Sequence, residues 1–255
     1  MKNFKGFSRG GVIIGILIIA FIGITTYLVV DGNNKATNFN NYNFYSIIEP
    51  SEDNGNIGDH IKGDKNAPVV IFEYADFQCG YCAMMNPIVD EIVEKADGKL
   101  AIVYRNYLLS YHQNGTAAAS AAEAAGLQGY WKEYVDILFD NQDEWASTSS
   151  SERSNLFNKY FNEVTNGKGD LDKFNSDISS NEVSKKINFD MGIGKRIDDI
   201  TGTPAFLIDG KLIDFGNKKG GSITIGDETF TWDSPMSTDE FSELILNIVN
   251  AKLAE

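Results

Sequence analysis

The chain of 255 residues contains only two cysteines, Cys79 and Cys82, and two residues separate them. A disulfide between them would close a very short loop, which constrains the unfolded chain little. Exported proteins that use cysteines as structural cross-links usually spread several of them along the sequence. The pair is therefore poorly placed to stabilise the fold, and its spacing indicates redox chemistry.

The reactivity of such a pair depends on the element that carries it. Residues 83–96, directly after the pair, place apolar side chains at helical spacing, which predicts a helix that begins at the cysteines. The N-terminus of a helix carries partial positive charge and free N–H groups, and both stabilise a thiolate. We therefore expect Cys79 to be the attacking thiolate and Cys82 the resolving thiol, working through a mixed disulfide with a substrate.

A zinc site is the main alternative for two cysteines at this spacing. Tetrahedral zinc needs two further ligands, and the only histidines are His60 and His112, far apart in the sequence. There is neither a second CxxC nor a pair of closely spaced histidines. The sequence therefore predicts no metal and no bound cofactor, because the two cysteines would carry the electrons themselves.

The elements around the pair indicate an α/β domain. Short β-branched, apolar runs flank the predicted helix at residues 69–72 and 100–105, which suggests a βαβ unit with parallel strands. Residues 113–199 show mostly helical patterns and predict an inserted all-helical subdomain. Strands are predicted again at 205–208 and 211–215, joined by the turn Asp209-Gly210, with a further strand in 222–232 and a last helix after Pro235.

Residues 69–87, VVIFEYADFQCGYCAMMNP, resemble the thioredoxin superfamily and its exported DsbA-like branch in particular. Glu73 matches the family's buried acid beneath the resolving cysteine, and Pro87 matches the proline that kinks the active-site helix. Thr203-Pro204, in TGTPAFLIDG, matches the loop whose cis-proline faces the cysteines. The resemblance covers roughly 63–255 and implies a thioredoxin-like fold with an inserted all-helical subdomain at about 113–199.

The resemblance gives Glu73 a role that its position supports. It lies in an otherwise apolar strand, where burial would raise its pKa and suit it to pass a proton to or from Cys82. The alternative is a strand-end carboxylate that faces water. An unpaired charge inside a core strand is costly, which favours the proton-transfer role.

The remaining expected site residues adjust the reactivity of the two cysteines. Most X–Pro bonds are trans, so only the resemblance implies a cis bond before Pro204. The backbone before it would offer a short edge to a substrate peptide, and the Thr203 hydroxyl would tune the facing sulfur. Gly80 and Tyr81 lie between the sulfurs and should set thiolate stability through local N–H groups and ring packing. This dipeptide does not settle the direction of electron flow.

Other conspicuous side chains have structural interpretations. His112 is expected to cap or pack a helix rather than to catalyse. The aromatic residues of the predicted helical subdomain are expected to form its core, while exposed members of the group could form a peptide-binding surface. They are Tyr130, Trp131, Tyr134, Phe139 and Trp145.

The N-terminal region predicts export. Residues 11–30 form an uncharged apolar run of the length that spans a bilayer. Residues 1–10 contain three cations and no acid, so the positive-inside rule leaves them in the cytoplasm as the end of a single-pass anchor. Residues 31–62, rich in Asn, Gly, Asp and Ser, predict a linker with one short packed element around 45–48, and 63–255 the extracytoplasmic domain. A cleaved signal peptide is the alternative, and in either case the domain is exported.

The formal net charge of −14 argues against binding to nucleic acid. We expect a membrane-anchored protein disulfide oxidoreductase that acts on exported proteins, as an oxidase. The resemblance implies a membrane partner of the quinone-coupled type that re-oxidises it. The alternatives are an isomerase or reductase with the same fold and, from another class, a non-enzymatic peptide-binding or chaperone module whose disulfide is inert.

Overall fold

The computed structural model describes residues 37–213, 220–233 and 235–255, and residues 39–255 form one compact unit. The cytoplasmic end predicted at 1–10 and the anchor predicted at 11–30 lie outside the described residues. Within the part of the chain that is described, no helix is both long and apolar enough to span a bilayer.

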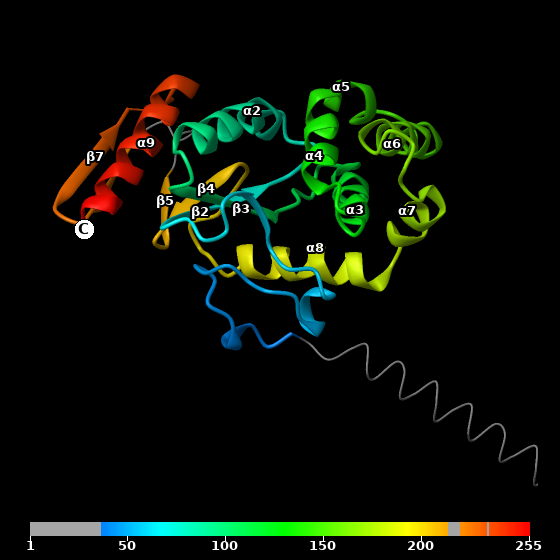
Figure 1. Cartoon of the computed structure of the whole chain (residues 1–255), viewed down its shortest axis with the longest axis horizontal. Helices are drawn as coiled ribbons and strands as arrows, with labels where there is room; N and C mark the ends of the chain where they lie inside the picture. Colours follow the sequence, from blue (N-terminus) through cyan, green and yellow to red (C-terminus); the bar gives the residue numbers. More distant parts are fainter. Residues whose placement is uncertain (1–36, 214–219, 234) are drawn as a thin grey trace, which may run out of the picture. The chain divides into compact units, whose positions relative to one another are not determined.

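A five-stranded mixed sheet lies at the centre of this unit, with strand order β1-β3-β2-β4-β5 (Figure 1). Strands β2 and β3 are parallel, as the βαβ pattern predicts, and the other neighbours are antiparallel. Every residue of β3 is buried, including Arg105 and Asn106 at its polar end. The strands are β1 (His60–Gly63), β2 (Val69–Ala75), β3 (Leu100–Asn106), β4 (Ala205–Ile208) and β5 (Lys211–Ile213).

Two helices cover one face of the sheet. Helix α2 (Gly80–Lys95) is the crossover between β2 and β3, and α9 (Thr238–Ala254) packs beside it (Figure 1). The capping box of Ser237 and Glu240 fixes the start of α9. Instead of one further strand in 222–232, the structure has an antiparallel hairpin, β6 (Gly221–Ile225) and β7 (Glu228–Trp232), because the chain turns at Gly226, whose φ is +54°.

The inserted subdomain is helical throughout its described length, as expected. Its aromatic residues form the core: Tyr134 and Trp145 are fully buried, Trp131 and Phe139 nearly so, and Tyr130 packs against them while partly buried. The helices are α3 (Gly115–Gly126), α4 (Trp131–Asp140), α5 (Gln142–Trp145), α6 (Ser150–Val164), α7 (Leu171–Asp177) and α8 (Asn181–Gly194).

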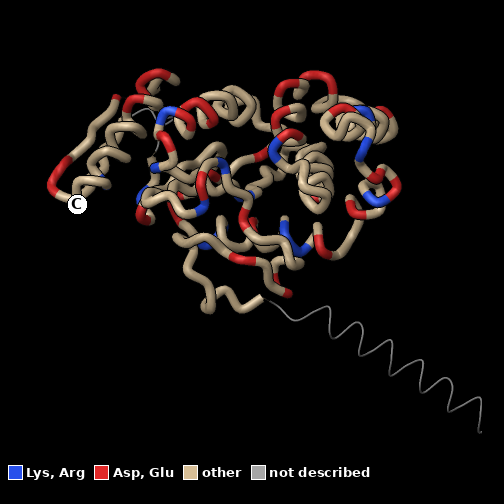
Figure 2. The backbone as a smooth tube through the Cα atoms, viewed as in Figure 1, with Lys and Arg blue, Asp and Glu red and all other residues tan. Residues whose placement is uncertain are grey.

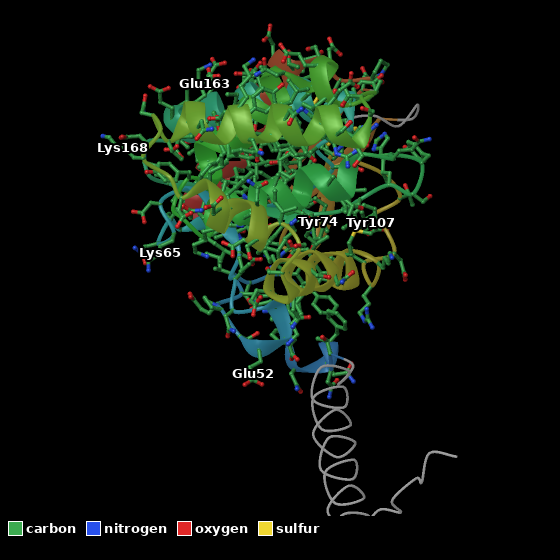
Figure 3. The ribbon with its side chains drawn as sticks, turned by 90° about the vertical axis from the view of Figure 1, so that its right-hand side faces the viewer. Glu52, Lys65, Tyr74, Tyr107, Glu163 and Lys168 are labelled. Carbon is green, nitrogen blue, oxygen red and sulfur yellow. The ribbon has the colours of Figure 1, made fainter. Side chains whose placement is uncertain are left out.

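The last helix of this subdomain, α8, covers the face of the sheet opposite α2 (Figure 1). Tyr74 on β2 and Tyr107 just after β3 lie side by side above it, with ring centroids 6.4 Å apart (Figure 3). A Cβ atom at Gly194 would lie 2.5 Å from the Tyr107 ring, which is too close, and 3.2 Å from the Tyr74 ring. The sheet thus separates an α2 side from an α8 side.

Residues 39–62 differ from the linker predicted for 31–62. They form two 3-10 turns, η1 (Phe39–Asn41) and η2 (Glu52–Asn54), and then β1 at the sheet edge. The buried Arg105 guanidinium donates to the carbonyls of Phe44 and Ser46 and pairs with the Asp59 carboxylate at 2.7 Å. Contacts to distant elements order this polar segment, so its local composition predicted a linker wrongly.

Candidate active site

The cysteines lie where β2 leads into α2. Cys79 is the last residue before the helix, with extended backbone angles, and Cys82 is in the first turn. Both are present as thiols. Cys79 is 7% exposed and Cys82 is completely buried, so only the Cys79 sulfur can be approached from outside.

The two thiols have opposite acidity. A hydrogen bond from Cys82 is the main influence that lowers the pKa of Cys79 to about 5, helped by Thr203 and by the backbone N–H groups of Tyr81 and Cys82, against the effect of burial. Burial is the main cause that raises the pKa of Cys82 well above its ordinary value. At neutral pH Cys79 is therefore a thiolate and Cys82 a neutral thiol that donates to it.

The loop before β4 closes over the Cys79 sulfur. The Thr203–Pro204 bond is cis, the isomer that the resemblance implies, and the Cys79 thiol donates to the Thr203 carbonyl at 3.3 Å. In this thiol form the buried Thr203 hydroxyl has no hydrogen-bond partner among the described residues. It is free to donate to a thiolate, which explains why it lowers the pKa of Cys79.

Glu73 is buried in the sheet, 3% exposed, so the water-facing alternative is wrong. Burial raises the pKa of its carboxyl to about 7, an effect that the Lys62 cation opposes and the Asp90 carboxylate reinforces. Its charge in turn helps to raise the pKa of Cys82. A carboxyl that titrates near neutral pH beside the resolving thiol can give or take a proton there.

A polar network links the surroundings of Glu73 to the surface. The buried Lys62 ammonium donates to the Asn86 amide oxygen at 2.6 Å and pairs with Asp90 at 2.9 Å. Asp90 also pairs with the half-exposed Lys132 on α4, at 2.7 Å. Lys62 was not predicted as a site residue, because it lies in the segment that was interpreted as a linker. Only the folded domain brings its ammonium group close to Glu73.

A groove of about 600 Å³ adjoins the redox site. It is lined by Tyr81 and Met84 of α2, which are 67% and 46% exposed, and by the Thr203–Pro204 loop and Met236. The Tyr81 ring was expected to pack against the sulfurs. Instead most of the side chain is exposed, and it lines the groove. The site can hold an extended, partly apolar peptide segment next to Cys79.

Both histidines have carboxylate partners. His60 pairs with Glu123 at 2.7 Å and stacks on the Trp131 ring, and His112 pairs with Asp76 at 2.8 Å. Within the described ranges no three His, Cys, Asp or Glu side chains gather in a way that could hold a metal ion. Sequence reasoning missed both pairs, since their members are far apart in the chain.

Comparison with protein families gives one match that covers most of the chain. The model of a family described as Thioredoxin matches residues 55–245. A curated relative, the Na(+)/H(+) antiporter NhaA 1 of Salinispora arenicola, is 32% identical over 157 residues, which is 60% of this chain and 22% of that protein. The chain therefore spans less than a quarter of the length of the curated relatives it matches.

Solved structures with the same fold include a protein of Wolbachia pipientis and one of Bacillus subtilis. Wolbachia pipientis alpha-DsbA1 is 23% identical, with a TM-score of 0.55 over 77% of this chain and 93% of that chain. BdbD from Bacillus subtilis is 16% identical, with a TM-score of 0.52 over 82% of this chain and 100% of that chain. At this level of identity the likeness establishes the fold.

Proposed function

The chain belongs to the thioredoxin family, and from that premise we propose that it is a thiol-disulfide oxidoreductase that donates its Cys79–Cys82 disulfide to exported proteins. The observation that carries the proposal is the contrast between the two thiols. Cys79, with a pKa of about 5, contacts Thr203, which lines the groove, while Cys82 is completely buried with a raised pKa.

Oxidation of a substrate takes two exchanges. A substrate thiolate attacks the Cys79 sulfur of the oxidised enzyme, which forms a mixed disulfide and releases Cys82 as a thiolate. Because the pKa of Cys82 is strongly raised, this thiolate takes up a proton, and Glu73 supplies it. A second substrate thiolate then attacks the substrate sulfur of the mixed disulfide and releases Cys79.

The acidity of Cys79 supports the oxidising direction. A thiol of low pKa is a good leaving group, which favours the second exchange. The same stabilised thiolate favours the reduced enzyme over the oxidised one, and this makes a disulfide a strong oxidant. Electrons then collect on the cysteine pair, so the proposal includes a membrane partner of the quinone-coupled type that removes them.

The proposed location is outside the cytoplasm, at the membrane. The apolar run 11–30, preceded by cations, would anchor the domain, and exported proteins with newly exposed thiols would be its substrates. This location also agrees with the redox role, because disulfides persist in oxidising compartments.

The test is the reduction potential of the Cys79/Cys82 pair, measured on the full chain in glutathione buffers. We expect about −120 mV, the value of a strong oxidant. A value of about −270 mV, as for thioredoxin, would identify a reductase instead. A pair that does not cycle at any accessible potential would leave a non-enzymatic peptide-binding module. Cys79→Ser should abolish oxidation of a reduced, unfolded substrate, and retention of full activity would contradict the proposal.

A further inference from the structure

Asp76, in the loop between β2 and α2, contacts both cysteines through its main chain. The Cys79 N–H donates to the Asp76 carbonyl at 3.0 Å. Burial raises the pKa of Cys82, and a hydrogen bond from the Asp76 backbone N–H partly opposes this effect. The position of the Asp76 backbone therefore affects the environment of both sulfurs.

The Asp76 side chain is completely buried and accepts three hydrogen bonds. The N–H of Gln78 donates to one carboxylate oxygen at 2.9 Å. The N–H of Leu109 and the Nδ1 of His112 contact the other, each at 2.8 Å. A buried carboxylate with three donors is held firmly, and removal of one donor leaves it less satisfied.

The first residue of α3 packs against the same carboxylate. A Cβ atom at Gly115 would lie 2.8 Å from Asp76 Oδ1, so only glycine leaves room for this approach. The carboxylate thus lies at the positive end of a helix of 12 residues. Asp76 joins the active-site loop, the segment after β3 and the start of the helical subdomain.

We propose that His112 is a positioning residue for the redox reaction, acting through Asp76 on the cysteine pair. This inference rests on the proposed function. His112 is the one side-chain donor among the three N–H groups recorded on the Asp76 carboxylate, and its own side chain is 16% exposed. Without it, the carboxylate shifts, and the backbone of Asp76 no longer holds Cys79 and Cys82 in the geometry that stabilises the thiolate.

The chain offers a matched control in His60. It also pairs with a buried carboxylate, that of Glu123, at 2.7 Å, and its side chain is 14% exposed. No contact joins this pair to either cysteine among the hydrogen bonds and ion pairs of the described residues. Replacing either histidine removes the imidazole partner of one buried carboxylate. Only the replacement of His112 should change the environment of the cysteine sulfurs.

The experiment compares the full-length wild-type chain with His112→Leu, His112→Asn and His60→Leu. The rate of Cys79 alkylation by iodoacetamide is followed across pH, together with the equilibrium against glutathione.

In His112→Leu we expect the midpoint of the alkylation profile to rise by about one pH unit, so that the rate in acid falls about tenfold. His112→Asn restores the profile, because its amide nitrogen occupies the δ position of the imidazole donor.

The outcomes separate the inference from the proposed function. A wild-type chain that neither alkylates in acid nor cycles with glutathione overturns the proposed function. A wild-type chain that does both, while His112→Leu keeps its profile or His60→Leu shifts equally, overturns the role of His112. Lower thermal stability in both Leu variants with an unchanged profile would mean a merely structural role. If His112→Leu does not fold, His112→Gln should show a smaller shift in the same direction, and no shift there would contradict the inference.

Discussion

Glu73 and Cys79 respond to pH in opposite ways. The pKa of Glu73 is raised from 4.5 to about 7, so the folded chain holds a proton there that the unfolded chain has lost. The pKa of Cys79 is lowered from 9.0 to about 5, so the reduced fold carries a thiolate where the unfolded chain carries a thiol. Stability therefore falls with rising pH through Glu73 and rises with pH through Cys79.

The Glu73 contribution can be isolated in the oxidised protein, whose cysteines do not titrate. Its free energy of unfolding should fall between about pH 4.5 and pH 7, by roughly 3 kcal/mol at most, which is the shift from 4.5 to about 7 expressed as energy. Glu73→Gln should flatten this decline in urea titrations. If the variant declines as steeply as the wild type, the pKa of Glu73 is not raised.

The Thr203 hydroxyl has a separate effect on Cys79. Since it can donate to the thiolate, Thr203→Val should raise the pKa of Cys79 and slow its alkylation severalfold in acid, as expected for the loss of one hydrogen bond. Thr201→Val is the matched control, because Thr201 lines the same groove. Equal alkylation profiles for both variants would exclude this role for Thr203.

At the scale of elements, the buried Asp59 carboxylate connects the segment 39–62 to β3 and α8. Asp59 and Arg105 have side chains that are 1% and 0% exposed, and the Lys186 ammonium approaches Asp59 at 3.5 Å. Asp59→Ala would leave Arg105 buried without its carboxylate. We expect the free energy of unfolding to fall by about 3–5 kcal/mol in urea titrations.

The control for this prediction is an exposed pair. Lys95 and Glu91 lie 2.6 Å apart on α2 with about half of each side chain in water. Lys95→Ala should change the free energy of unfolding by less than about 1 kcal/mol. If Asp59→Ala is as mild as Lys95→Ala, the segment 39–62 does not contribute to the stability of the domain.

The same segment shows where prediction from the sequence ends. Helices α6 and α8 lie within 113–199, where the local helical pattern predicted helices, and the side chains of Ser149 and Ser180 cap their first turns. Residues 39–62 are polar and are ordered by Arg105 and α8, which lie far away in the sequence. Their packing cannot be read from local composition.

The site residues also fall into two groups: those that the sequence places together and those that only the folded chain brings together. Cys79 and Cys82 lie at the start of one helix, so their spacing placed them together, and the family resemblance added Glu73 on the preceding strand. His112 reaches Asp76 across 36 positions of sequence, a contact that only the folded loops create. Tyr81 was placed correctly beside the cysteines, while its exposure depends on the groove that distant segments build.

At the scale of the whole molecule, charge governs encounter with substrates. The net charge is −14, and acidic residues are spread over the elements on both sides of the sheet (Figure 2). Such a field attracts cationic partners, and salt screens it. Reduced peptides with lysines around their cysteines should therefore be oxidised faster at low ionic strength.

Stopped-flow rates across a salt series would measure this effect. Lysine-rich peptides should slow as salt rises, peptides with glutamates should speed up, and the uncharged thiol β-mercaptoethanol should show little change. Parallel salt dependence for all three would mean that the overall charge has no part in substrate encounter.

The folded segment 39–59, which Arg105 holds through Phe44 and Asp59, forms a brace that we expect to determine how the domain responds to tension. A pull on the chain at residue 38 enters the folded unit at η1 and meets Arg105 and Asp59 on the α8 side of the sheet. The cysteines lie at the start of α2, the helix that covers the other face of the sheet (Figure 1). We expect tensile force to strain β3 and the brace first. The relative position of the two cysteine sulfurs should therefore stay unchanged until the contacts between the brace and Arg105 break.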